Sequence, residues 1–290
     1  MHTLQNKQLE IKIKETGAEL TSIIANGKEY LWQGNPEFWT GQAPILFPII
    51  GKLKEGYYLF EGQRYELPQH GFFRASTDIE LTSSSETACS FSLKSNEKTK
   101  AVYPFVFDFR TSYELVENKI VIRHEVENTG KDRLYFSLGE HPAFNCSLVD
   151  QNIKHDQCYL EFEKEENASI VLLSKEGAIS SETQEYLKNS NRIELPPAVF
   201  ERDALIFKKM NSKKVTLINK SEGKLVTCRY KDFPNLGIWA KPMAPYVCIE
   251  PWFGYADTFD SNQQFQDKEG IISLEVGGLF KCTFEIEIHL

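Results

Sequence analysis

Three short segments of the sequence combine a titratable side chain with proline or glycine and with aromatic neighbours. They are residues 67–74 (LPQHGFFR), 139–145 (GEHPAFN) and 248–254 (CIEPWFG). Proline restricts the preceding residue to extended geometry, so we expect His141 and Glu250 at strand ends or rims, with a defined direction. An imidazole and a carboxylate titrate on either side of neutrality and together can supply an acid and a base near pH 7. The alternative is that these segments are ordinary turns with structural histidines.

Other common catalytic sites are absent from the sequence. It contains no G-x-S-x-G elbow, no phosphate-binding G-x-x-x-x-G-K-[ST] loop and no G-x-G-x-x-G fingerprint. His124-Glu125 begins like a zinc-protease motif, but Asn128 occupies the position of the second histidine. The six cysteines are too far apart for a C-x-x-C motif and are expected to be reduced, buried thiols. We therefore predict neither a metal nor a cofactor.

Charge and hydropathy limit the partners and the compartment. The 290 residues carry a formal charge of −8, without any block of basic residues, which disfavours nucleic acid as a partner. Residues 1–10 contain no apolar run typical of a signal peptide. The longest uncharged run, residues 38–51, has 14 residues and two prolines, whereas a membrane span needs about 20 apolar residues. We expect a soluble cytoplasmic protein that does not bind membranes.

The elements that must position the three segments are predicted to be strands. Apolar and polar residues alternate in residues 9–14, 105–110, 120–127 and 284–289, a period typical of strands with one buried face. Turn residues such as Asn128-Thr129-Gly130 separate these segments. Only residues 181–193 could form a helix of any length, and even they include two Asn and two Ser.

Many short strands with little helix predict an all-β fold, a large antiparallel β-sandwich or barrel. The sequence contains no flexible linker, internal repeat or low-complexity tract. We therefore expect a single domain that spans residues 1–290.

The three segments belong to a longer series of motifs that resembles the aldose 1-epimerase (galactose mutarotase) family, most closely its LacX-like branch. In chain order the motifs are Trp32-Gln33-Gly34 with Trp39, residues 43–51 (APILFPIIG), HGFFR, HPAFN, residues 203–207 (DALIF) and CIEPWFGYAD. The resemblance covers nearly the whole chain. It implies a β-supersandwich and the reversible interconversion of the α and β anomers of a sugar without a cofactor.

The resemblance also implies roles for individual residues. By similarity to the family's HPxF and EP motifs, His141 would be the general acid and Glu250 the general base. His70 would hold sugar hydroxyls or the ring oxygen, and Asp203 would accept hydrogen bonds from hydroxyls. A protonated His141 with an ionised Glu250 fits this chemistry near pH 7. The alternative for Asp203 is a solvated loop acid.

Three further candidate residues each have two possible roles. Many family members carry Arg at the position of Lys52, and Lys is the less directional donor. Arg74 would supply the missing guanidinium or lie at the rim of the pocket. Trp252 would stack on the C–H face of a sugar or pack in the core.

Three other functions are weighed against mutarotation of a free aldose. A hexose 6-phosphate mutarotase would use Lys52 and Arg74 as a phosphate clamp, but the sequence has no glycine-rich phosphate loop. A non-catalytic sugar-binding protein would not need His141 and Glu250 together. A glycoside hydrolase usually needs two carboxylates that flank the bond, and only Glu250 lies in a convincing setting. The sequence therefore favours an isomerase that acts on a free hexose.

Overall fold

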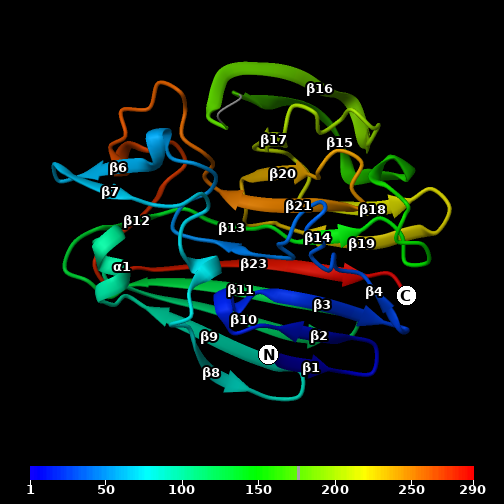
Figure 1. The fold of residues 1–290 in the computed structure, drawn as a ribbon, viewed down its shortest axis with the longest axis horizontal. Helices are drawn as coiled ribbons and strands as arrows, with labels where there is room; N and C mark the ends of the chain where they lie inside the picture. Colours follow the sequence, from blue (N-terminus) through cyan, green and yellow to red (C-terminus); the bar gives the residue numbers. More distant parts are fainter. Residues whose placement is uncertain (175–176) are drawn as a thin grey trace.

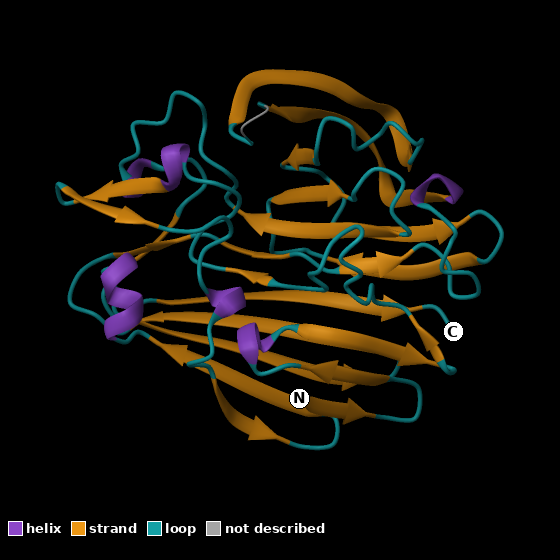
Figure 2. Cartoon of the chain, in the orientation of Figure 1, coloured by secondary structure: helices purple, strands orange, loops and turns teal. Residues whose placement is uncertain are grey.

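The computed structural model describes residues 1–174 and 177–290, and strands dominate it. The chain is 51% strand and 7% helix, which confirms the all-β class (Figure 2). The four alternating segments contain or overlap β2 (Glu10–Ile13), β10 (Phe107–Val116), β11 (Lys119–Asn128) and β23 (Leu279–Ile288). Buried and more exposed residues alternate along these strands, as expected where one face of a sheet covers a core.

One large antiparallel sheet organises the molecule. Its strands follow the order β5-β13-β21-β20-β17-β15-β18-β19-β23-β11-β10-β9-β8, with β14 paired to β21 and β16 paired to β15. The other strands of this sheet are β5 (Ile45–Leu46), β8 (Glu80–Ser84), β9 (Ala88–Lys94), β13 (Leu138–Glu140), β14 (Ala143–Asn145), β15 (Cys158–Leu173), β16 (Ile179–Glu194), β17 (Leu205–Lys208), β18 (Lys214–Asn219), β19 (Gly223–Arg229), β20 (Asn235–Trp239) and β21 (Tyr246–Phe253).

Three small antiparallel sheets complete the strand structure. They are formed by β1 (His2–Gln5), β2, β3 (Leu20–Ala25) and β4 (Lys28–Glu29), by β6 (Tyr57–Phe60) with β7 (Gln63–Glu66), and by β12 (Leu134–Phe136) with β22 (Ile272–Leu274). Short 3-10 turns lie at η1 (Thr16–Ala18), η2 (Lys54–Gly56), η3 (Phe73–Ala75), η4 (His155–Gln157) and η5 (Phe265–Asp267).

The large sheet folds over on itself into two layers (Figure 1). β13, β20 and β21 lie in the upper layer, and β9, β10, β11 and β23 lie in the lower layer. Apolar side chains from both layers form one buried cluster, in which Phe109 and Ile286 of the lower layer join Phe144 and Ile249 of the upper layer. This is the sandwich that the strand pattern predicted. No helix among the described residues is long and apolar enough to cross a bilayer.

The cysteines occupy the interior, as expected. All six are buried and carry free thiols, namely Cys89, Cys146, Cys158, Cys228, Cys248 and Cys282. Burial raises the pKa of the Cys248 thiol well above its usual value. These side chains therefore behave as small apolar groups in the absence of a ligand.

The prediction of helices was wrong at two places: the expected helix is a strand, and the α-helix lies elsewhere. Residues 181–193 lie within β16, which pairs antiparallel with β15 through several irregular registers. Tertiary pairing therefore decides the conformation of a segment whose own helix propensity is weak. The α-helix of the described chain is α1 (Glu97–Val102), whose first turn is closed by Asn96 and Thr99 in a reciprocal capping box.

Candidate active site

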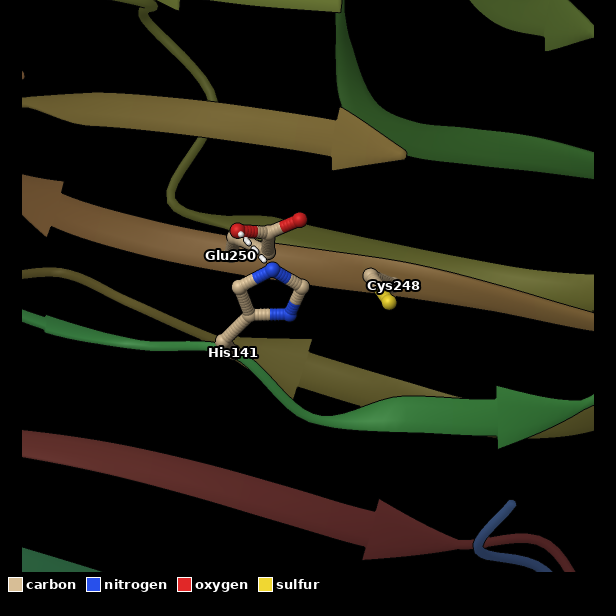
Figure 3. A group of neighbouring side chains, drawn as sticks. All are labelled: His141, Cys248 and Glu250. Atoms are coloured by element: carbon tan, nitrogen blue, oxygen red, sulfur yellow. Dashed lines mark ion pairs between the residues drawn. The ribbon is translucent and has the colours of Figure 1, made fainter. Parts of the chain in front are cut away.

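The pairing of three strands brings His141 directly opposite Glu250. β13 and β14 both pair with β21, and the register is the same on either side of the interruption at His141-Pro142, with Gly139 opposite Trp252 and Ala143 opposite Cys248. Directly opposed residues of an antiparallel pair share one face and lie close together. The Nε2 atom of His141 accordingly lies 3.2 Å from Oε2 of Glu250 (Figure 3).

Aromatic rings enclose this pair. The Trp39 ring stacks on the His141 imidazole with centroids 4.7 Å apart, and Trp239 meets the same imidazole edge-on at 5.8 Å. Trp239 lies opposite Cys248 in the pairing of β20 with β21, so it shares a face with Glu250. His141 is 7% exposed and Glu250 1% exposed, so the pair is nearly excluded from solvent.

Burial determines which charge state the pair favours. It lowers the pKa of His141 to about 3, and the positive charge of Arg74 acts in the same direction. Burial also raises the pKa of Glu250 well above its usual value, with a further contribution from the nearby charge of Asp203. Both shifts favour the neutral forms of the two groups, whereas the sequence led us to expect a protonated His141 with an ionised Glu250.

His70 lies next to the pair as a hydrogen-bond donor. Its backbone has a φ of 67°, followed by Gly71 at 72°, and this turn brings its ring to 5.7 Å from the His141 ring, nearly perpendicular to it. The Gly51 N–H donates to Nδ1 of His70 over 3.1 Å, which assigns the proton of the neutral ring to Nε2; this nitrogen lies 3.3 Å from the side-chain amide of Gln69. Burial is the main cause that lowers the pKa of His70 well below its usual value, so the ring stays neutral.

Asp203 lies at the entrance to a large cavity. It has a φ of 74° in the loop before β17, and its carboxylate accepts a hydrogen bond from the Ala204 N–H over 2.9 Å. The cavity has a volume of about 1030 Å³ and is lined by Asp203, Trp239 and residues of β15 and β16. The lining includes neither His141 nor Glu250, and Trp239, whose ring meets that of His141 edge-on, connects this cavity to the pair.

The structure places the other three predicted residues at different distances from the pair. Arg74 lies in η3, half-buried, and its charge lowers the pKa of both His70 and His141, so the guanidinium is close to the site. Lys52 is exposed and its side chain lies beside Gly177. Trp252 is 5% exposed and packs in a small apolar cluster with residues such as Ile50, which favours the packing role over sugar stacking.

The sequence analysis did not single out Trp239 or Cys248, and it named Trp39 only as part of a motif. Trp239 and Cys248 could have been found from the alternation of β20 and β21, once these two strands were known to pair. Trp39 lies outside the strands, and its stack on His141 depends on tertiary packing.

Comparison with known proteins identifies the class to which this fold and site belong. The sequence model of the family "Aldose 1-epimerase" matches residues 1–281. The chain belongs to the aldose 1-epimerase family, so it is an isomerase and its substrate is a sugar. The predicted family and enzyme class are thereby confirmed.

The particular relatives fall in the predicted branch. The chain is 33% identical to "Protein LacX, plasmid" of Lactococcus lactis subsp. lactis, with 98% of both chains covered. It is 33% identical to a "galactose mutarotase related enzyme" from Lactobacillus acidophilus, with a TM-score of 0.93 and coverage of 100% and 97%. A "galactose mutarotase-like protein" from Lactobacillus casei ATCC 334 gives a TM-score of 0.93 at 28% identity and covers 100% of both chains.

Proposed function

We propose that the protein interconverts the α and β anomers of a free aldose, with His141 as general acid and Glu250 as general base. The observation that carries this proposal is the buried 3.2 Å contact between the two side chains, which adjoins a cavity large enough for a hexose. Family membership supports the reaction class. The reaction requires only proton transfers and rotation about one carbon–carbon bond, so the proposal includes no cofactor.

The proposed reaction has three stages. Glu250 removes the proton of the anomeric hydroxyl while His141 protonates the ring oxygen, and the C1–O bond to the ring oxygen breaks. The open-chain aldehyde rotates about C1–C2. His141 then takes back the proton of the hydroxyl at the former ring oxygen as that oxygen attacks the other face of C1. Glu250 returns its proton to the carbonyl oxygen, and the site is restored.

Sugar binding must move the resting proton from Glu250 to His141. The 3.2 Å contact allows this transfer without movement of either backbone. Bound hydroxyl groups donate hydrogen bonds to a carboxylate and therefore favour its ionised form. The enclosed site then holds an ion pair whose two members are already oriented for the reaction.

Neighbouring residues would hold the sugar in place. We assign the Nε2–H of His70 as a donor to a hydroxyl or to the ring oxygen, because its Nδ1 accepts a hydrogen bond from the Gly51 N–H. The carboxylate of Asp203 would accept hydroxyl protons at the edge of the cavity. The guanidinium of Arg74 would donate to oxygen atoms near the two histidines.

Polarimetry of a freshly dissolved pure anomer tests the proposal. We expect the approach to equilibrium of α-glucose or α-galactose to accelerate in proportion to protein concentration, above a blank measured in the same buffer. A panel of anomerically pure aldoses followed by NMR identifies the preferred sugar. No acceleration with any aldose would contradict the proposal, and binding of the same sugars without acceleration would indicate a non-catalytic sugar-binding protein. Release of the chromophore from a chromogenic glycoside would indicate a hydrolase instead.

A sugar phosphate is the competing substrate, and the geometry disfavours it. A phosphate site usually combines several charge-assisted donors. Here Arg74 is half-buried beside the histidines while Lys52 is exposed beside Gly177. The comparison is kcat/KM for glucose or galactose against their 6-phosphates in one assay. A preference of about tenfold or more for the phosphate, worth ~1.4 kcal/mol, would overturn the assignment and direct mutagenesis to Lys52 and Arg74.

A further inference from the structure

A third side chain, which the proposed reaction does not use, lies with the acid–base pair. One ligand atom from each of His141, Cys248 and Glu250 lies within 4.8 Å of the other two, and all three residues are buried. Cys248 and Glu250 are two positions apart on β21, so both side chains project from the same face of the strand. Figure 3 shows the imidazole of His141 next to both of them.

The three donors together form a set typical of zinc. Imidazole nitrogen, thiolate sulfur and carboxylate oxygen are the ligand types of Zn²⁺, and three protein ligands with an open fourth position are usual where small molecules reach the metal. With ordinary zinc bond lengths, a tetrahedral site holds its ligand atoms roughly 3.3 to 3.6 Å apart. The Nε2–Oε2 pair is 3.2 Å apart and no two of the three ligand atoms are more than 4.8 Å apart, so a bound metal would draw the side chains together by roughly 1 Å.

The unused nitrogen of His141 is an independent indication of a ligand. Nδ1 is buried and has no hydrogen-bond partner among the described residues. Buried polar atoms without a partner are rare. In Figure 3 this second nitrogen lies on the side of the ring nearer the sulfur of Cys248. The imidazole therefore has one nitrogen directed at Glu250 and a second, unpartnered nitrogen on the side of Cys248.

Charge also favours a divalent cation at this position. Zn²⁺ bound to a thiolate, a carboxylate and a neutral imidazole forms a centre with no net charge. Such a centre avoids the cost of an uncompensated charge in a buried site. The metal would take the place of the proton that the pair shares.

We propose that His141, Cys248 and Glu250 form an inhibitory site for zinc or a similar borderline-soft divalent cation. The bound metal occupies both acid–base groups and so competes with the sugar. The inhibition rests on the proposed mutarotase function, whereas the binding of the metal does not. Two experiments therefore separate the two ideas.

The first experiment measures binding without reference to activity. Metal-free protein is titrated with Co²⁺, and the near-ultraviolet charge-transfer band of a cobalt–thiolate bond is recorded. Zinc bound after dialysis is counted per chain. We expect one site per chain and a thiolate band, with affinity at least about tenfold lower in Cys248→Ala, the least that the loss of an outer-shell partner usually costs.

Controls make the binding result decisive. Cys282→Ala removes another buried thiol, from β23, and is expected to bind as the wild type does. Cys248→Ser preserves the side-chain volume and replaces Cys248→Ala if that variant does not fold. A wild-type titration without a thiolate band overturns the proposal whatever the variants do. Equal binding by wild type and Cys248→Ala overturns it as well.

The second experiment measures inhibition of mutarotation. We expect Zn²⁺ to raise the apparent KM for the sugar, to leave kcat unchanged and to be reversed by a chelator, in both wild type and Cys282→Ala. Cys248→Ala should keep the basal activity and require at least about tenfold more zinc for the same inhibition. Equal zinc sensitivity of Cys248→Ala, or activation by zinc, contradicts the proposal. If no protein is active, the mutarotase proposal fails while the binding experiment still decides the metal site.

Discussion

At the scale of single residues, the proposed acid–base pair depends on its environment more than on its composition. His141 and Glu250 are a cross-strand pair, enclosed by Trp39 and Trp239 and almost without access to water. In such surroundings both groups favour their neutral forms. In the proposed reaction, the single proton that the pair shares across this short contact can then be transferred to the ring oxygen or to the anomeric oxygen of the sugar.

The substitutions His141→Asn and Glu250→Gln should each remove most of the enzymatic mutarotation. A positioned acid or base contributes about 10²–10⁴-fold, and both substitutions retain a polar side chain of similar shape. We expect the double variant to lose little more than either single variant, because the two groups act as a unit. Polarimetry at equal protein concentration provides the rates.

A matched control for these variants is His2→Asn. The side chain of His2, on β1, lies 3.3 Å from the exposed carboxylate of Glu15. It should retain wild-type activity. Circular dichroism establishes that each variant is folded. Near-wild-type turnover by either folded site variant would show that its residue is not part of the acid–base pair.

The pH dependence of kcat/KM should be bell-shaped, with an unusually low acid limb. Activity requires the singly protonated pair. It falls at low pH when a second proton binds, and the lowered pKa of His141, about 3, moves this limb well below the usual value for histidine. It falls at high pH when the shared proton is lost, and the raised pKa of Glu250 moves that limb well above the usual value for a carboxyl group.

The measurement is kcat/KM across the pH range in which the protein stays folded. The spontaneous rate is subtracted at each pH, because acid and base also accelerate mutarotation without the enzyme. An acid limb near pH 6.5, the ordinary value for histidine, would contradict the depressed pKa. Intrinsic fluorescence at each pH distinguishes titration of the site from acid unfolding.

At the scale of elements, two glycines on neighbouring strands make room for Trp252 on the face that carries Glu250. A Cβ atom at Gly139 of β13 would lie 2.5 Å from the indole, and a Cβ atom at Gly237 of β20 would also lie 2.5 Å from it. Gly237 is directly opposite Glu250 in the sheet. The indole thus extends across β21 beside Glu250, and this packing depends on the absence of side chains at both glycines.

Gly237→Ala should therefore destabilise the protein. Overpacking of this kind typically costs about 1–3 kcal/mol, and we expect a lower urea midpoint with an unchanged slope. Gly130→Ala is the matched control, because its Cβ atom would have no neighbour closer than 3.2 Å. Combination of Gly237→Ala with Trp252→Leu should recover part of the loss. Equal stability of the two glycine variants would contradict the packing argument.

At the scale of the whole molecule, a polar contact joins the two layers of the folded sheet. Nε2 of His124 on β11 lies 2.6 Å from Oε1 of Glu140 on β13, and both side chains are fully buried. Glu140 precedes His141 in the chain and points to the opposite face of the strand. The contact therefore links β13, which ends immediately before His141, to the other layer.

Glu140→Ala should lower the free energy of unfolding by about 3–5 kcal/mol, since it leaves His124 buried without its partner. We expect wild type and variant each to unfold in one transition, as a single domain would, when near-ultraviolet and far-ultraviolet circular dichroism are followed together. The double replacement Glu140→Leu with His124→Leu should be less destabilising than Glu140→Ala, because it removes both polar groups. A variant as stable as the wild type would show that the contact contributes little.

The sequence by itself determined the all-β class, because period-2 alternation in segments such as β11 and β23 reflects which face of a strand is buried. It also identified His141 and Glu250 as candidates, because proline next to each fixes local geometry. These are local properties of the chain. Residues 181–193 show the limit of such reasoning, since their strand conformation depends on pairing with β15.

Only the tertiary structure decided how the site is assembled. His141 and Glu250 are far apart in the chain, and the common register of β13 and β14 against β21 is what places them opposite each other. The same pairing adds Cys248 to the cluster, although the spacing of the cysteines in the sequence indicates no metal site. Burial of the pair then favours the neutral forms of both groups rather than the ion pair that the sequence led us to expect. Burial and cross-strand contacts arise between segments remote in sequence, so no local pattern of residues encodes them.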